Sequence, residues 1–379
     1  MKIGILTLPL HTNYGGNLQA YALMTVLKEM GHEVWLINRQ GARIPRWKLP
    51  LAIIKRLLMK YVLNKKDIEI FVEAKIRKEY SIISQYTQPF TEKNIQPQTK
   101  AAYSTRNLSR VVSRCQFDAI VVGSDQVWRP AYTSNIEDYF LGFLKSNKTK
   151  RISYAASFGT DEWGFSAEQE VQCAKYLKLF DAVSVRESSG VKFCNKHFDI
   201  DAQHVLDPTM LLEVSKYLEL VEPVRNEAKA EGVLVYILDE TSDKTAVIES
   251  VSNLLQKSIF RVNSKTEDKS ATLQDRIAPP TEKWIKGFYE ADFIITDSFH
   301  ACVFAILFNK PFLVYGNQYR GVARFSSLLS MFDLTDRLIF SAKDFKSEEI
   351  LKEINWENVN AILELKKREA RVYLNNILK

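Results

Sequence analysis

The chain has 379 residues, of which 46% are hydrophobic and 26% charged, and its formal net charge is +7. This length predicts about two domains, and the composition is that of a globular protein, which excludes a disordered or fibrous chain. No apolar run reaches the ~18 residues that a membrane span requires. Residues 1–10 lack the pattern of a signal peptide and are expected to form a buried strand. The four cysteines are scattered, which predicts reduced thiols and a cytoplasmic protein.

Strands and helices alternate through the first part of the chain. The pattern predicts a strand at residues 3–8, a tight loop at 13–17, and a helix at 18–30 that Gly31 ends. A further helix is expected at 167–180. Four more strands are predicted in this part, at 33–38, 119–122, 151–156 and 182–185.

A composition break at residues 222–231 precedes a second series. Its strands are predicted at 233–238, 293–295 and 312–315, and its helices at 244–256, 284–290 and 301–308. A long, charged, amphipathic helix is predicted at 356–378. Two such series predict an α/β fold of two doubly wound Rossmann-like domains, with the ligand in the cleft between them.

The chain is therefore expected to divide into three parts. Residues 1–222 would form an N-terminal α/β domain that carries a basic helical insertion at 39–113. Residues 223–345 would form a C-terminal α/β domain. Residues 346–379 would form a helix that packs back on the N-terminal domain.

The insertion begins with a strongly basic segment, because residues 39–66 contain nine basic residues and no acidic one. A predicted helix there has an apolar face, formed by Ile53, Ile54, Leu57, Leu58, Tyr61 and Val62, opposite Lys55, Arg56 and Lys60. Such helices lie on anionic membranes, but an ordinary surface helix packed by its apolar face has the same pattern. We favour the packed helix for the apolar face. The charge surplus still indicates an acidic partner, such as a membrane surface, whereas no nucleic-acid-binding motif is present.

The most informative stretch is residues 284–325, where a polar cluster separates an apolar strand from an apolar helix. Thr296, Asp297 and Ser298 are residue types that begin helices, and His300 lies in the first helical turn. The carboxyl end of a strand is where open α/β sheets bind ligands, and a helix N-terminus favours an anion. His300 near arginines suits acid catalysis on a phosphate or carboxylate ester, although a histidine that only caps its helix fits the spacing equally well.

Six blocks of the sequence resemble the polysaccharide pyruvyl transferase family. They are NYGGNLQAY at 13–21, VGSDQVW at 122–128, YAASFG at 154–159, VSVRE at 183–187, LDPT at 206–209 and TDSFHA at 296–301. The similarity covers about residues 1–335. It implies a GT-B-like fold with the acceptor on the N-terminal domain and the donor on the C-terminal domain. It also implies transfer of pyruvyl from phosphoenolpyruvate to two hydroxyls of a sugar, which forms a cyclic ketal in the synthesis of a capsule or exopolysaccharide.

The resemblance also implies site residues. The predicted catalytic residues are His300, Arg186 and Arg320, which handle the donor. The predicted substrate-binding residues are Asn13, Gly15, Gly16, Asn17, Asp125, Gln126, Ser157, Ser298 and Arg324. Many members of the family carry arginine where this chain has Ser298, so Arg320 or Arg324 is expected to supply that charge.

Several of these residues have a structural alternative. Gly15 and Gly16 also suit a tight turn, Asp125 and Gln126 a helix cap, and Arg186 an ion pair with Glu187. Residues 207–209 are expected to form a turn at a domain boundary, without a catalytic carboxylate. The other four histidines, His11, His32, His197 and His204, are expected to be structural.

The predicted chemistry suits these residue types. Arginine holds phosphate and carboxylate groups bidentately, and histidine can donate a proton near neutral pH. No cofactor and no metal are expected, since arginines would neutralise the donor and no ligand spacing is present. The expected partners are phosphoenolpyruvate and a sugar acceptor, such as a lipid-linked oligosaccharide at the inner face of the membrane. Two alternatives stay open: a nucleotide-sugar glycosyltransferase and a non-catalytic glycan-binding relative.

Overall fold

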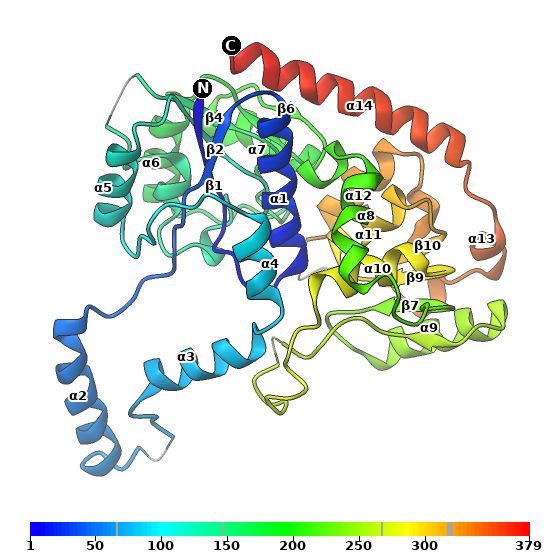
Figure 1. Ribbon diagram of the computed structural model, residues 1–379, viewed down its shortest axis with the longest axis horizontal. Helices are drawn as coiled ribbons and strands as arrows, with labels where there is room; N and C mark the ends of the chain where they lie inside the picture. The colour runs from blue at the N-terminus through cyan, green and yellow to red at the C-terminus, as the bar shows by residue number, and fades with distance from the viewer. Residues whose placement is uncertain (66, 146–147, 267, 317–320) are drawn as a thin grey trace.

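The computed structural model describes residues 1–65, 67–145, 148–266, 268–316 and 321–379. It contains two parallel sheets with helices around them (Figure 1). The α/β class and the two Rossmann-like domains predicted from the sequence are confirmed. Among the described residues, no helix is long and apolar enough to cross a membrane, and all four cysteines are free.

The first sheet has the strand order β2-β1-β3-β4, and its strands are β2 (Glu33–Leu36), β1 (Lys2–Leu6), β3 (Ala119–Val122) and β4 (Lys150–Ser153). A short parallel pair, β5 (Ser184–Val185) and β6 (Gln203–His204), extends it through isolated bridges from Ile152 and Ala156. The helices of this part are α1 (Tyr14–Glu29), α4 (Thr87–Asn94), α5 (Thr105–Cys115), α6 (Ala167–Leu177), α7 (Ser188–Phe198) and α8 (Val214–Val221).

The second sheet has the order β11-β10-β9-β7-β8, and its strands are β11 (Leu338–Ile339), β10 (Phe312–Tyr315), β9 (Phe293–Thr296), β7 (Val233–Tyr236) and β8 (Ile259–Phe260). Its helices are α9 (Ser242–Leu255), α10 (Thr281–Glu290), α11 (Phe299–Leu307), α12 (Val322–Met331) and α13 (Ser347–Leu351). Most of the central strands are buried on both faces, as expected for a parallel sheet covered by helices.

The last helix, α14 (Trp356–Ile377), runs back to the first sheet (Figure 1). Lys150 at the start of β4 donates to the carbonyl of Ile377 at 2.7 Å. The Tyr373 hydroxyl lies 3.3 Å from the carbonyl of Ser153, at the other end of β4. A buried apolar stripe of α14, which includes Val359, Leu363 and Leu374, joins the large core that both sheets share.

One predicted loop is a helix. Residues 13–17 were expected to form a tight loop, but α1 begins at Tyr14. The side chain of Asn13 accepts a hydrogen bond from the Gly16 amide at 3.0 Å, so Asn13 is the N-cap and the two glycines belong to the first turn. The sequence prediction missed this because consecutive glycines disfavour helix when they have no tertiary support.

A second prediction is wrong in the basic insertion. Its first helix, α2 (Leu49–Tyr61), was expected to pack by its apolar face, yet it contains no buried residue. Figure 1 shows α2 and the following α3 (Val72–Ile83) extending away from the two sheets. Most of the large apolar side chains of α2 are exposed, among them Leu51, Ile54, Leu57, Leu58 and Tyr61.

Candidate active site

A cavity of about 870 Å³ lies where the carboxyl ends of the two sheets face each other. In the first sheet the chain passes from β1 to β2 on one side and then returns to β3 on the other side of β1. In the second sheet it passes in the same way from β7 to β8 and then to β9 on the other side of β7. These topological switch points are where doubly wound sheets bind ligands. The cavity is lined from both, by Asp125 and Gln126 after β3 and by residues 236–238 and 297–300 after β7 and β9.

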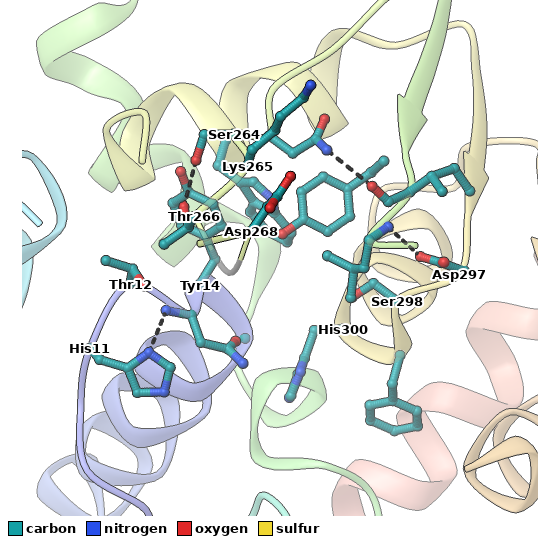
Figure 2. Close-up of a pocket in the computed structure, with 18 of the residues that line it drawn as sticks. His11, Thr12, Tyr14, Ser264, Lys265, Thr266, Asp268, Asp297, Ser298 and His300 are labelled. Atoms are coloured by element: carbon teal, nitrogen blue, oxygen red, sulfur yellow. Dashed lines mark hydrogen bonds between the residues drawn. The ribbon is translucent and has the colours of Figure 1, made fainter. Parts of the chain in front are cut away.

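His300 projects into this cavity from the first turn of α11 (Figure 2). Ser298, two residues before His300, occupies the N-cap position of α11, but its side chain makes no capping hydrogen bond. Across the domain junction, α1 passes so close that a Cβ at Gly15 would overlap the imidazole ring of His300. At Gly16, one residue on, an added Cβ would only touch Asp125 at 3.4 Å. Gly15 therefore serves close packing between the domains, and Gly16 does not.

A buried carboxylate, Asp207, connects His300 to the first domain. Its Oδ2 atom lies 3.6 Å from His300 Nε2 and 2.9 Å from Arg186 Nη1, and it accepts a hydrogen bond from Ser124 Oγ at 2.8 Å. Its Oδ1 atom accepts from the amide and the hydroxyl of Thr209. Burial opposes ionisation of Asp207, but His300 and Arg186 outweigh it and hold the pKa of that carboxyl well below its usual range.

The structure thus gives Asp207 two functions. Residues 207–209 form the expected turn, since Asp207 caps the short helix at Pro208–Leu211. The sequence analysis did not expect its carboxylate to reach the site histidine. Among the described residues, Nε2 of His300 has no hydrogen-bond partner and its nearest ionic group is Asp207 of the other domain, so helix capping does not explain this histidine.

Two arginines flank the ring of Phe299, next to His300. The guanidinium carbon of Arg186 lies 4.6 Å from the ring centroid, and that of Arg324, on α12, lies 5.5 Å from it. Burial, with the nearby charge of Arg186, lowers the pKa of Arg324 to about 10, so its side chain stays cationic at neutral pH. Arg324 lines the cavity, whereas the Arg186 side chain is fully buried behind it.

Arg186 has hydrogen-bond donors that no described residue uses. Its Nη1 atom is held by Asp207, but no described residue accepts a hydrogen bond from Nε or Nη2. Asp125 Oδ1 lies 3.6 Å from Nη2, and Glu187 Oε2 lies 3.9 Å from Nε. The main ion pair of Arg186 is therefore with Asp207, not with its sequence neighbour Glu187, which instead accepts from the amides of Phe158 and Gly159.

Asp125 has an unusual backbone at the edge of the cavity. Its φ angle is +75°, a left-handed conformation that non-glycine residues adopt rarely and that often marks functional sites. Its Oδ1 atom accepts from the Gln126 amide at 2.8 Å, and Gln126 in turn accepts from Arg129. This turn points the Asp125 carboxylate toward α1 and Arg186.

The structure brings together most, but not all, of the predicted site residues. Those that line the cavity are Asn13, Gly15, Asp125, Gln126, Ser298, His300 and Arg324. Gly16, Asn17, Ser157 and Arg186 lie behind this layer, and the Asn17 side chain donates to the carbonyl of His11. Arg320 lies outside the described residues. Trp128 is core, since it is fully buried and stacks on Phe140.

Other lining residues were missed by the sequence analysis. His11 was expected to be structural, but it borders the cavity beside Thr12. The loop residues 264–266, 268 and 275 form the wall opposite, and Figure 2 shows Ser264, Lys265 and Thr266 across the cavity from His300. The loop has neither strand nor helix periodicity, so the sequence contained no signal for its placement. Within the described residues, no group of three or more His, Cys, Asp or Glu side chains is placed to hold a metal ion.

A family model named polysaccharide pyruvyl transferase matches residues 13–319, which is most of the chain. The chain belongs to the polysaccharide pyruvyl transferase family. The match includes the six sequence blocks, and all of them except residues 154–159 supply at least one side chain to the cavity lining or to the contacts of Asp207. The protein is accordingly a transferase of polysaccharide synthesis. No curated relative matches the transferase.

The solved structures that the transferase resembles share its fold at low sequence identity. A UDP-GlcNAc 2-epimerase from Methanocaldococcus jannaschii has a TM-score of 0.52 and 12% identity, over 98% of this chain and 94% of the other. A UDP-N-acetylglucosamine 2-epimerase from Rickettsia bellii has a TM-score of 0.49 and 11% identity, over 100% and 96%. The first likeness agrees with the two-domain, GT-B-like fold of the transferase and says nothing of its substrate.

Proposed function

We propose that this protein transfers pyruvyl from phosphoenolpyruvate to two hydroxyls of a sugar, which gives a cyclic ketal and phosphate. The observation that carries the proposal is that His300 lines the cavity 3.6 Å from the Asp207 carboxylate, and that Arg324 lines the same cavity. A proton donor beside fixed cations is what an enol phosphate with a carboxylate requires. The family match supports the same class of reaction.

The proposed reaction begins with proton transfer. His300 gives a proton to the methylene carbon of the enol, and the neighbouring carbon becomes cationic. A sugar hydroxyl adds to that carbon and loses its proton, the bond to the phosphate oxygen breaks, and a second hydroxyl closes the ring. Of the two hydroxyl protons, one returns to His300 and the other leaves with phosphate. The Asp207 carboxylate lies 3.6 Å from His300, and the phosphate and carboxylate of the donor would bring further negative charge to the side of the cavity that Arg324 lines.

Arg324 takes the place of the arginine that many members of the family carry at the position of Ser298. It lines the cavity beside the Phe299 ring, so we assign it to the carboxylate or phosphate of the donor. The small Ser298 side chain leaves room for that contact. Asp125, which follows β3 and lines the cavity, is assigned to an acceptor hydroxyl. Lys265 and Thr266 on the opposite wall then face the acceptor.

The acceptor is proposed to be a sugar of a cell-surface polysaccharide or of its lipid-linked precursor. The cavity is far larger than phosphoenolpyruvate, so it has space for sugar units beside the donor. No protein-bound cofactor is proposed, because the donor carries the transferred group.

The test is to incubate the protein with phosphoenolpyruvate and a panel of sugar acceptors, and to measure phosphate release and product mass. The product should gain the mass of pyruvate less one water. Phosphoenolpyruvate alone should raise the melting temperature more than UDP- or GDP-sugars do, because a ligand of the native state stabilises it. Turnover of a nucleotide sugar, with no phosphate release from phosphoenolpyruvate, would favour a glycosyltransferase and refute the proposal.

A further inference from the structure

The basic insertion carries an exposed apolar stripe. Five side chains recur at intervals of four and three residues along η1 (Arg46–Lys48) and α2, and each is between 52% and 72% exposed: Trp47, Leu51, Ile54, Leu58 and Tyr61. Such spacing places them on one side of a helix. Isolated exposed apolar residues are normal on a protein surface, but a continuous stripe of large ones marks a surface that another partner covers.

The charge around the stripe identifies the partner. Among the basic residues of segment 39–66 that the structure describes, Arg39 pairs with Asp138 and Arg56 pairs with Glu73. Lys48, Lys55 and Lys65 are exposed. The segment has no carboxylate of its own to balance them. An apolar stripe beside lysines fits a surface that is apolar below and anionic above, which is the interface of a bilayer with acidic headgroups.

The base of the insertion contacts the wall of the active-site cavity. Glu79 on α3 lies 3.4 Å from Arg276, and the carbonyl of Ile83, at the end of α3, accepts a hydrogen bond from the Ala278 amide. These contacts adjoin the loop residues 264–266 and 275, which line the cavity opposite His300. Arg56 joins α2 to α3 through Glu73 with two hydrogen bonds. Binding of α2 to a surface would therefore bring the active-site cavity close to that surface.

We propose that α2 lies in the plane of an anionic membrane, with the apolar stripe in the headgroup boundary and Lys48, Lys55 and Lys65 over the lipid phosphates. This peripheral contact is independent of the chemistry in the cavity. It would position the enzyme where a lipid-linked sugar is presented.

The proposal is tested by sedimentation of the full chain with vesicles of phosphatidylcholine alone or mixed with phosphatidylglycerol. Binding should require the anionic lipid and should weaken as salt rises. Lys48→Gln with Lys55→Gln and Lys65→Gln should weaken it by about 100-fold, which corresponds to about 1 kcal/mol for each charge. Equal binding to both vesicle types at low salt would overturn the proposal.

A matched pair of variants tests the apolar stripe. Leu51→Ser with Leu58→Ser should weaken vesicle binding by about tenfold or more, because each leucine loses its place in the lipid. Leu365→Ser with Val372→Ser, on α14, changes side chains of similar exposure (51% and 57%) and should leave binding unchanged. Both variants should melt as the wild type does, since these side chains are exposed. Equal losses in the two variants would overturn the proposal.

Trp47 offers a direct probe of depth. Its fluorescence, taken as the difference between wild type and Trp47→Phe, should shift to the blue and be quenched by brominated lipid in anionic vesicles. If the stripe is instead the contact with a second copy of the chain, Leu51→Ser with Leu58→Ser would convert a dimer to a monomer and leave vesicle binding intact. That outcome would also overturn the proposal. None of these measurements requires turnover, so their failure would leave the proposed reaction untouched.

Discussion

The site histidine is held by groups from the opposite domain. Gly15 packs closely against the His300 side chain, and Asp207 Oδ2 lies 3.6 Å from its Nε2 atom. Both residues belong to the part of the chain before residue 222, whereas His300 belongs to the second sheet. The geometry of the proposed proton donor therefore depends on how the two domains meet, and a small change at either contact should affect turnover more than folding.

His300→Gln tests the proposed proton donor. The glutamine keeps a polar side chain of similar size, so the variant should fold and bind phosphoenolpyruvate. Its turnover at saturating donor should fall by a factor on the order of 10² or more, the usual contribution of a general acid. Phosphate release and melting temperature are measured together. Near-normal turnover in a folded variant would remove His300 from the mechanism.

Gly15→Ala and Gly16→Ala form a matched pair in the same helical turn. The added methyl at position 15 would overlap the His300 ring and must displace it, so turnover should fall at least about tenfold. At position 16 the methyl makes ordinary contact, and turnover should stay near that of the wild type, with stability equal or up to about 1 kcal/mol higher because alanine favours helix. Equal effects on turnover would contradict the close approach to His300.

Asp207→Asn tests the charge network through its dependence on pH. The folded pKa of Asp207 lies below its unfolded value of 3.8, so the carboxylate stabilises the native state fully above that value. Its contribution is lost as pH falls toward the folded pKa. The difference in unfolding free energy between wild type and variant, measured by urea denaturation, should therefore be constant from pH 7 to about pH 5 and shrink at lower pH. A difference that grows on acidification would contradict an ionised Asp207.

At the scale of elements, buried polar contacts fix the turns that follow the strands. After β9, Asp297 accepts hydrogen bonds from the amides of Leu238 and Asp239, which follow β7. Lys244 on α9 contacts the same carboxylate at 2.7 Å, and both side chains are buried. This arrangement holds the ends of the two central strands together directly below Ser298 and His300, so Asp297 is a structural residue of the site.

Lys244→Met should destabilise the protein by about 3–5 kcal/mol, because it leaves the Asp297 carboxylate buried without its cation. Lys257→Met is the matched control. It breaks a lysine–aspartate contact of 2.9 Å with Asp292, where the side chains are 45% and 38% exposed, and should cost at most about 1 kcal/mol. Urea unfolding measures both. Similar costs for the two variants would show that burial of the Lys244 pair does not decide its energetic role.

At the scale of the whole molecule, the cavity is shared by two sheets and α14 connects them. The helix begins after the second sheet and ends beside β4 of the first, where it accepts a hydrogen bond from Lys150. Its buried stripe lies in the core cluster that includes residues of both sheets. Binding of a ligand in the cavity should therefore change amide protection in both halves of the chain.

Amide hydrogen exchange can test whether both sheets contribute to ligand binding in the cavity. Phosphoenolpyruvate should slow amide exchange in residues 13–17 at the start of α1 and in residues 297–302 at the start of α11, because both line the cavity. The exposed helix α2 serves as the internal control and should exchange at the same rate with and without the donor. Protection confined to the second sheet would show that the first domain does not take part in donor binding.

The order of the strands and helices and the family of this protein could be predicted from the sequence alone. Alternating apolar segments predicted the order of strands and helices, and β3 and β10 have the predicted bounds. Local patterns succeed here because a parallel strand buried on both faces must be apolar throughout. The family also followed from short sequence blocks, and one of them contains His300, which lines the cavity.

Only the tertiary structure decided the rest. Asp207 and Gly15 are distant from His300 in sequence, and their contacts arise where the domains meet. The early start of α1 and the solvent exposure of α2 depend on what does or does not pack against each helix. A sequence pattern gives a helix its faces, but burial is a property of its neighbours, and those are fixed by long-range packing.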